Sequence, residues 1–191
     1  MPLKSVVKVA HISNLSDARY CAGMGVDMLG FSVIPGTEHY MSPAVFQDIR
    51  GWLSGPKIVA ELYGMASAEE IRTALSSYSP DYFELTFEQF KAYEKDLTLP
   101  CIVNLADSAA ALTLEKHPRI THVIVDENTD CSAIRNMQLP VLVNVTSVEI
   151  LHSKMAANCF GGYVMEGPRE VRPGITNYDQ LGVLLEALEE E

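Results

Sequence analysis

The sequence contains little positive charge and no long hydrophobic run. Its 14 lysines and arginines stand against 25 aspartates and glutamates, which gives a net charge of −11. Proteins that bind nucleic acid or an anionic membrane surface present a basic face, so this composition argues against both kinds of partner. No apolar run reaches the ~18 residues of a membrane span. Met1–Lys4 does not lead into the apolar region of a secretory signal, and we therefore expect a cytoplasmic protein.

Sequence motifs for nucleotides and metals are also missing. Neither GxGxxG nor GxxxxGK(S/T) follows the first apolar run, which removes the usual reasons to expect a nucleotide. The cysteines, which show no CxxC spacing, are Cys21, Cys101, Cys131 and Cys159. In a chain without a secretory signal we expect free, reduced thiols, two or three of them in core strands. We expect no cofactor and no metal site.

The sequence does contain a repeated pattern of short apolar runs and amphipathic segments. Apolar residues make up 48% of the 191 residues and charged residues 20%, which suits one globular domain over residues 1–191. The runs with the length and composition of strands are Val6–Ile12, Met28–Ile34, Lys57–Leu62, Tyr82–Leu85, Cys101–Leu105, His122–Val125, Val141–Val145 and Tyr163–Met165. Helical patterns lie near Leu15–Met24, Pro43–Leu53, Ala68–Ser77, Phe87–Asp96, Ser108–Lys116, Cys131–Met137, Ser147–Met155 and Tyr178–Glu190.

Helix-start signals stand just after several of these strands. Capping boxes, in which two side chains satisfy free backbone donors, are predicted at Ser67–Glu70, Thr86–Gln89 and Thr146–Glu149. Ser42 followed by Pro43 predicts a further helix start. Strands that alternate with helices pair in parallel through right-handed crossovers. Eight units of about 24 residues predict an α/β fold, a compact single-domain (β/α)8 TIM barrel, with an open doubly wound sheet as the alternative.

In such a barrel the chemistry takes place at the carboxyl ends of the strands. The polar residues predicted there are His11, His39, Asn104, Asp126, Asn144 and Glu166. Asp126 follows a buried run, where it could be a general acid with a raised pKa or could cap the next helix. Asn104 and Asn144 could bind a ligand or tie down their own loops. The two histidines could reach the mouth of the pocket or remain on the surface.

Two segments of the chain resemble a known family. Lys8–Ala18 is similar to the first strand and helix start of phosphoribosylanthranilate isomerase, a (β/α)8 barrel of tryptophan biosynthesis. The family's second strand and loop are matched without a gap by Gly30, Phe31, Pro35, Tyr40, Ser42 and Pro43. Further matches are Asp126 at a strand end and the pair Pro173–Gly174. The resemblance is specific over about the first 45 residues.

The resemblance implies an Amadori rearrangement, which converts an aminoaldose to an aminoketose with a general acid and a general base. In the family, an aspartate at the end of strand six is the acid and a cysteine at the end of strand one is the base. The aspartate matches Asp126, whereas the cysteine position is Ala10, which cannot take up a proton. His11 is adjacent, but the alternation of side chains along a strand predicts that it points elsewhere.

Further departures from the family concern the substrate's anionic groups. The arginine that contacts the substrate is His39 here, and the long loop after strand six is reduced to Glu127–Asp130. The paired glycines of the phosphate site are replaced by Asn144–Thr146, and small hydroxyl residues by Met165–Gly167. Glu166 would repel a phosphate dianion by about 4 kcal/mol for unit charges ~4 Å apart at an effective dielectric of 20.

We therefore expect a divergent barrel that lacks the family's isomerase activity and binds or acts on an unknown small polar ligand at the strand ends. One alternative is an active isomerase, with Asp126 as acid and His11 or His39 as a substitute base. Another is a non-catalytic interaction or structural barrel. In that case the mouth of the barrel would be filled by Met65, Met165, Tyr40 or Phe87. No feature of the sequence predicts an oligomeric state.

Overall fold

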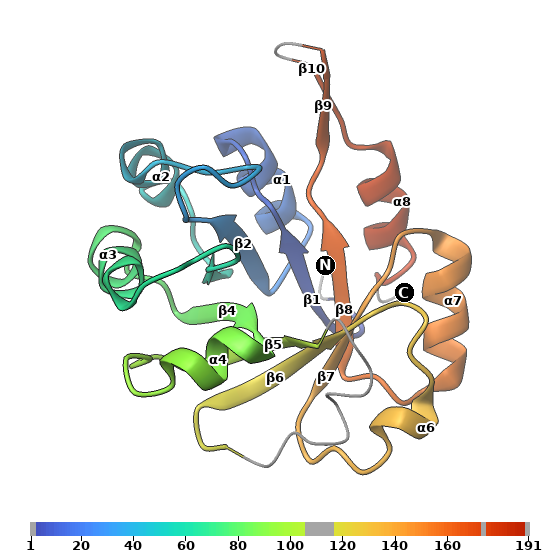
Figure 1. The fold of residues 1–191 in the computed structure, drawn as a ribbon. Coiled ribbons are helices and arrows are strands. Elements are labelled where there is room, and N and C mark those ends of the chain that lie inside the picture. Colours follow the sequence, from blue (N-terminus) through green and yellow to red (C-terminus); the bar gives the residue numbers. More distant parts are fainter. Residues whose placement is uncertain (1–2, 106–116, 173–174, 190–191) are drawn as a thin grey trace.

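The strands form a closed parallel barrel, as the alternating pattern predicts (Figure 1). The computed structural model describes residues 3–105, 117–172 and 175–189. The barrel strands are β1 (Val6–Ala10), β2 (Met28–Ser32), β3 (Lys57–Glu61), β4 (Tyr82–Thr86), β5 (Cys101–Leu105), β6 (Ile120–Val125), β7 (Val141–Asn144) and β8 (Gly162–Glu166). Each strand pairs with the next, and β8 closes the ring by pairing with β1. The predicted (β/α)8 barrel is confirmed, and the open sheet is excluded.

Helices surround the barrel on its outer side (Figure 1). They are α1 (Leu15–Gly23), α2 (Pro43–Arg50), α3 (Ala68–Tyr78), α4 (Phe87–Tyr93), α6 (Cys131–Ile134), α7 (Val148–Ala157) and α8 (Asp179–Glu186). The helix predicted near Ser108–Lys116 and the pair Pro173–Gly174 lie outside the described residues. No helix in the described ranges combines the length and the apolar character that crossing a membrane requires.

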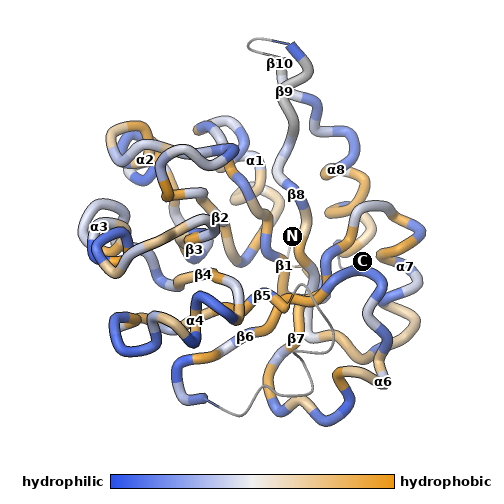
Figure 2. Tube along the Cα trace, viewed as in Figure 1, coloured by the Kyte–Doolittle hydropathy of each residue, from blue (hydrophilic) through white to orange (hydrophobic). Residues whose placement is uncertain are grey.

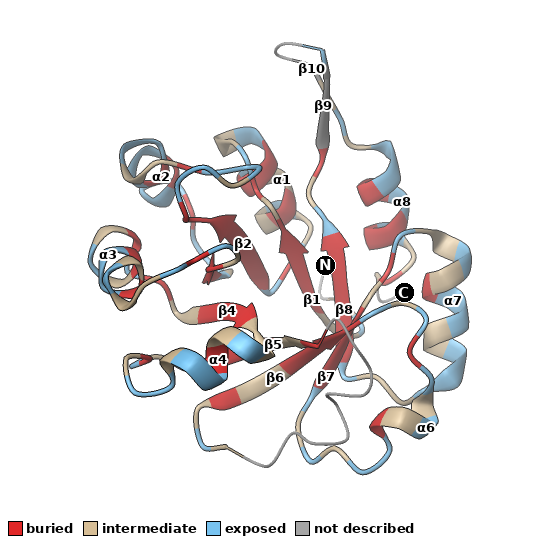
Figure 3. Ribbon diagram, viewed as in Figure 1, coloured by how far each residue is buried: buried red, intermediate tan, exposed pale blue. Residues whose placement is uncertain are grey.

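The apolar side chains form two separate layers because successive strand residues point to opposite faces. Outward-facing residues such as Val7 and Val9 pack against the helices. The inward-facing set fills the barrel with Ala10, Met28, Val59, Ile102, Ile124, Leu142 and Val164. Figure 2 shows the apolar strands at the centre, and Figure 3 shows that they are buried while the helices expose their outer faces. The barrel is therefore a packed core that opens only at its ends.

The predicted helix starts are correct at three of four positions. Thr86 and Gln89 exchange hydrogen bonds at the start of α4. Glu70 accepts from the backbone N–H of Ser67, and the Ser42 hydroxyl accepts from Val45. The fourth prediction, Thr146–Glu149, is wrong by one residue. Ser147 caps α7 by accepting from Ile150, because Thr146 donates its hydroxyl hydrogen to Glu127 instead.

A hairpin that the sequence pattern did not predict lies between β8 and α8. It consists of β9 (Arg169–Arg172) and β10 (Ile175–Asn177), which pair antiparallel and project beyond the barrel at the top of Figure 1. The segment Arg-Glu-Val-Arg has a single apolar residue, so it carries none of the apolar signal by which the barrel strands were found.

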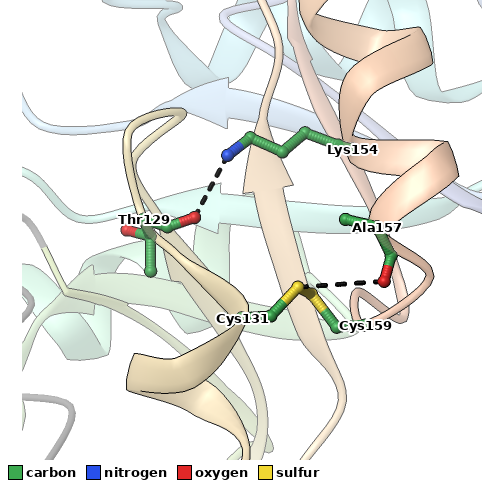
Figure 4. Close-up of a disulfide and its surroundings, with 5 residues drawn as sticks. All are labelled: Thr129, Cys131, Lys154, Ala157 and Cys159. Atoms are coloured by element: carbon green, nitrogen blue, oxygen red, sulfur yellow. Dashed lines mark hydrogen bonds between the residues drawn. A yellow bond between two sulfur atoms is a disulfide. The ribbon is translucent and has the colours of Figure 1, made fainter.

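The expectation of four reduced cysteines is wrong for two of them. Cys131 at the start of α6 and Cys159 after the end of α7 form a disulfide, although they are 28 residues apart (Figure 4). Cys21 and Cys101 are free and fully buried, and only Cys101 lies in a strand. The pairing depends on the packing of α6 beside the end of α7, a tertiary contact that cysteine spacing does not encode.

Candidate functional site

A cavity of about 260 Å³ opens at the carboxyl ends of the strands, where chemistry is expected in this fold. Five of the six predicted site residues line it: His11, Asn104, Asp126, Asn144 and Glu166. The sixth, His39, lines an adjoining cavity together with His11 and Glu166. The apolar residues that would fill the mouth of a structural barrel do not line these two cavities in the described chain. Met65 and Met165 are instead buried against the helices.

His11 points into the cavity, contrary to the direction that strand alternation predicts. It follows the last residue of β1 and has a φ of 53°, so the backbone turns out of the strand at this residue. Its Nδ1 lies 2.8 Å from Oε2 of Glu166, and its Nε2 lies 3.6 Å from Oε2 of Glu61. The hydrogen bond with Glu166 raises the pKa of His11 above its ordinary value, although burial acts in the opposite direction. The imidazolium form is therefore favoured.

The two predicted histidines lie against each other at the mouth of the cavity. Their rings are stacked, with centroids 5.1 Å apart and planes inclined by 24°. His39 also has a positive φ, 63°, and its Nε2 lies 3.5 Å from Glu38. Left-handed backbone is unfavourable for residues other than glycine, and such residues cluster at functional sites. The pair therefore marks this side of the cavity as a candidate ligand-binding wall.

Asp126 lies on the cavity wall but does not cap the next helix. Its Oδ1 accepts from both the backbone N–H and the side-chain amide of Asn128, at 2.8 and 2.7 Å. The N-cap residue of α6 is Asp130, so the capping alternative is wrong. The carboxylate instead shapes the turn after β6, which is a common role for aspartate. It remains an exposed negative charge at the strand ends.

The two asparagines lie on β5 and β7, which are separated by β6, and both line the cavity. Asn104 donates its amide to the hydroxyl of Tyr63, at 2.9 Å, a residue 41 positions away in the sequence. It therefore joins two walls of the cavity, whereas the loop that follows β5 lies outside the described residues. Asn144 at the end of β7 contributes an amide to the same space.

The sequence analysis missed Lys8, which lies inside the barrel with no exposed surface. Its Nζ is 2.6 Å from Oε1 of Glu61 and 2.8 Å from Oε2 of Glu84. Burial alone would lower the pKa of Lys8, but the two carboxylates raise it above its ordinary value. Burial raises the pKa of Glu84, against the effect of Lys8. The alternation of side chains along the strand could have predicted this placement, because Lys8 lies between the outward-facing Val7 and Val9 and must point inward.

Tyr63 connects the buried charged residues to the cavity. Its hydroxyl donates to Oε1 of Glu84 at 2.5 Å, and both residues line the cavity. Burial, followed by the nearby Glu84, raises the pKa of Tyr63 well above its ordinary value, so the phenol keeps its proton. Lys8, Glu84 and Tyr63 thus form a continuous polar chain from the barrel interior to the site.

The cavity is strongly acidic. The carboxylates that line it are Glu84, Asp126, Glu127 and Glu166. A third cavity of about 350 Å³ adjoins it near α8 and also includes Glu166. Neither lysine nor arginine is found among the described residues that line these three cavities. Within the same part of the chain, no group of three or more histidines, cysteines or acidic residues is arranged to hold a metal ion.

Known proteins are similar to this chain in both sequence and fold. No protein-family model matches the chain. The N-(5'-phosphoribosyl)anthranilate isomerase of Saccharomyces kudriavzevii is 29% identical over 108 residues, which are 52% of this chain and 48% of that protein. The match thus spans about half the length of the curated relative. The phosphoribosylanthranilate isomerase of Thermotoga maritima has a TM-score of 0.76 at 18% identity, with 96% of this chain and 98% of that chain covered.

The barrel of this chain is similar in fold to phosphoribosylanthranilate isomerases. The enzyme of that name from Thermus thermophilus gives a TM-score of 0.73 at 18% identity, over 96% of this chain and 98% of that one. The enzyme from Pyrococcus furiosus gives 0.70 at 14% identity, with the same coverage. In this isomerase-like barrel, Ala10 ends β1 and lines the cavity at the position where the resemblance implies the catalytic cysteine.

Proposed function

We propose that this barrel binds a small, polar, positively charged molecule at the carboxyl ends of its strands and has lost the isomerase activity. The observation that carries the proposal is the charge of the cavity wall. Asp126, Glu127 and Glu166 line it, and the one basic side chain in the described lining is that of His11, which pairs with Glu166. A cation gains Coulomb energy in such a cavity, whereas a phosphate dianion is repelled. An amine-bearing molecule fits this wall best.

The loss of the isomerase activity is supported by the groups at the end of β1. Ala10 cannot take up a proton, and the loss of a general base typically slows a reaction 10²–10⁴-fold. His11 is the titratable side chain next to Ala10, and its Nδ1 is already engaged in the hydrogen bond with Glu166 at 2.8 Å. The alternative of an active isomerase with Asp126 as acid would therefore need His11 to act as the base while it is paired with Glu166. The alternative of a purely structural barrel is less favoured because the mouth is open and polar.

A direct isomerase assay tests the negative part of the proposal. Phosphoribosylanthranilate is generated in situ, and the loss of its fluorescence is followed with the wild-type protein, with Asp126→Asn and with Ala10→Cys. We expect no turnover by the wild type above a heat-inactivated control. Turnover by the wild type that Asp126→Asn abolishes would show that the isomerase activity is retained and that another residue replaces the cysteine.

A ligand titration tests the positive part. Isothermal calorimetry compares 1,4-diaminobutane, glycerol and ribose 5-phosphate as a cationic, a neutral and an anionic probe. We expect binding of the diamine, weakened at least fivefold in Glu166→Gln and unchanged in Glu88→Gln, which removes an exposed carboxylate of α4 that does not belong to the cavity lining. Preferential binding of ribose 5-phosphate would contradict the proposed charge preference.

A further inference from the structure

The acidic wall of the cavity depends on a short loop with few attachments. This loop, residues 126–130, connects β6 to α6 and carries Asp126 and Glu127 into the cavity lining. The helix that follows it has only four residues, and a single one of them, Ile134, is buried. The loop and α6 therefore have little apolar packing of their own, and other contacts must hold them in place.

Within the described residues, three contacts attach the loop and the residue after it to the rest of the barrel. The Thr146 hydroxyl donates to Oε2 of Glu127 at 2.6 Å. Lys154 donates its ammonium to the carbonyl oxygen of Thr129 at 3.1 Å, and the disulfide joins Cys131 to Cys159 (Figure 4). The last two contacts both lead to α7 or to the residues just after it. The disulfide is the one covalent restraint among the three, and it lies directly after the loop.

The two disulfide cysteines differ in reactivity from the other two. Cys131 and Cys159 are partly exposed, so a thiol reagent can reach them. Cys21 and Cys101 are fully buried, and burial raises the pKa of each thiol to about 12. A buried thiol in its protonated form is neither a nucleophile nor easily oxidised. Redox chemistry in the native protein is therefore confined to the Cys131–Cys159 pair.

We propose that Cys131 and Cys159 form a reversible thiol–disulfide site, and that its reduction frees the loop and weakens ligand binding in the cavity. The effect on binding rests on the proposed function, whereas the redox chemistry does not. The reductant is a dithiol. One of its thiolates attacks Sγ of either cysteine and forms a mixed disulfide, and the other cysteine leaves as a thiolate. The second thiol of the reductant then displaces the first cysteine.

The exchange is balanced in electrons and protons. The dithiol gives up two electrons and two protons and becomes a disulfide, and the protein gains two thiols. The carbonyl oxygen of Ala157 lies 3.9 Å from Sγ of Cys131, where it can accept a weak hydrogen bond from the reduced thiol (Figure 4). The reduced state thus has a local partner for Cys131 but no covalent link between α6 and the residues after α7.

The redox site is tested by equilibrating the native protein in buffers of reduced and oxidised dithiothreitol, alkylating free thiols and mapping peptides by mass spectrometry. We expect Cys131 and Cys159 to pass reversibly between a linked and an alkylated form, while Cys21 and Cys101 react only after denaturation. If the two peptides are never linked, even in the most oxidising buffer, the proposal is wrong.

Hydrogen–deuterium exchange then measures how readily the backbone of the loop opens. Reduction should raise exchange at least tenfold in residues 126–135 and leave Lys57–Glu61 unchanged, and equal exchange in both states would overturn the proposal.

The effect on the cavity is measured with 1,4-diaminobutane by calorimetry. We expect the reduced protein to bind the diamine at least threefold more weakly than the oxidised protein. The variant Cys131→Ser/Cys159→Ser should bind with the affinity of the reduced protein in both oxidising and reducing buffer. Ser132→Ala, an exposed position in the same helix, should keep the full redox response. Equal affinity of the two redox states would overturn the coupling. If neither state binds the diamine while the exchange of the loop still responds to reduction, the proposed ligand class is wrong and the redox site stands.

Discussion

The ammonium of Lys8 lies 2.6 Å from a carboxylate oxygen of Glu61 inside a barrel that excludes both side chains from solvent. Glu84, the register partner of Glu61 on the neighbouring strand, lies 2.8 Å from the same ammonium. Transferring such charges from water into the interior is unfavourable, and each depends on the others for compensation. The arrangement therefore makes the interior sensitive to the loss of any one partner, although it adds little net stability by itself.

Removal of the buried ammonium should be strongly destabilising. Lys8→Met removes the ammonium that Glu61 and Glu84 share, and breaking a buried pair in this way costs about 3–5 kcal/mol of unfolding free energy. Urea denaturation measures the change. Lys57→Met is the matched control, because Lys57 pairs with Asp81 on the surface with 59% of its side chain exposed, and such pairs contribute about 0–1 kcal/mol. Equal effects of the two substitutions would show that the interior charges do not depend on one another.

Gly30 should be indispensable because it leaves room for this ion pair. A Cβ at this position would overlap Oε1 of Glu61 and lie 2.8 Å from Nζ of Lys8. We expect Gly30→Ala to lower the free energy of unfolding by about 1–3 kcal/mol, the usual range for overpacking. Gly23→Ala is the control, since no described atom lies within 4 Å of a Cβ there. Gly23 is exposed in α1, so alanine should stabilise the protein by up to ~1 kcal/mol.

The parts of the fold that the sequence predicted correctly depend on local chemistry. β-branched runs indicated the strands, and Thr86–Gln89 and Ser42–Pro43 marked helix starts, because these signals act over a few residues. The direction of His11 could not be predicted, because it depends on a φ of 53° that no residue pattern requires. The disulfide between Cys131 and Cys159 depends on how α6 packs beside α7. Side-chain roles at the site thus depend on tertiary contacts.

Reduction of the disulfide should lower stability as well as free the loop. The bond closes a chain segment of 28 residues. In the chain-entropy account, a loop of about this size gives a stabilisation of roughly 3–4 kcal/mol. Urea denaturation with and without a reducing agent measures the difference in unfolding free energy. Cys131→Ser/Cys159→Ser should be insensitive to the reductant, and a response of this variant would assign the effect to another part of the chain.

The ion pair between His11 and Glu166 should make stability depend on pH. Its hydrogen bond raises the pKa of His11 above 6.5, so this contribution is fully present below pH 6.5 and is lost as the pH rises through the folded pKa. Glu166→Gln should lower the pKa of His11, measured by NMR titration of its ring protons, while Glu88→Gln should leave it unchanged. The stability difference between wild type and Glu166→Gln should be largest below pH 6.5 and should shrink at higher pH. A difference that grows as the pH rises would show that Glu166 does not stabilise the imidazolium.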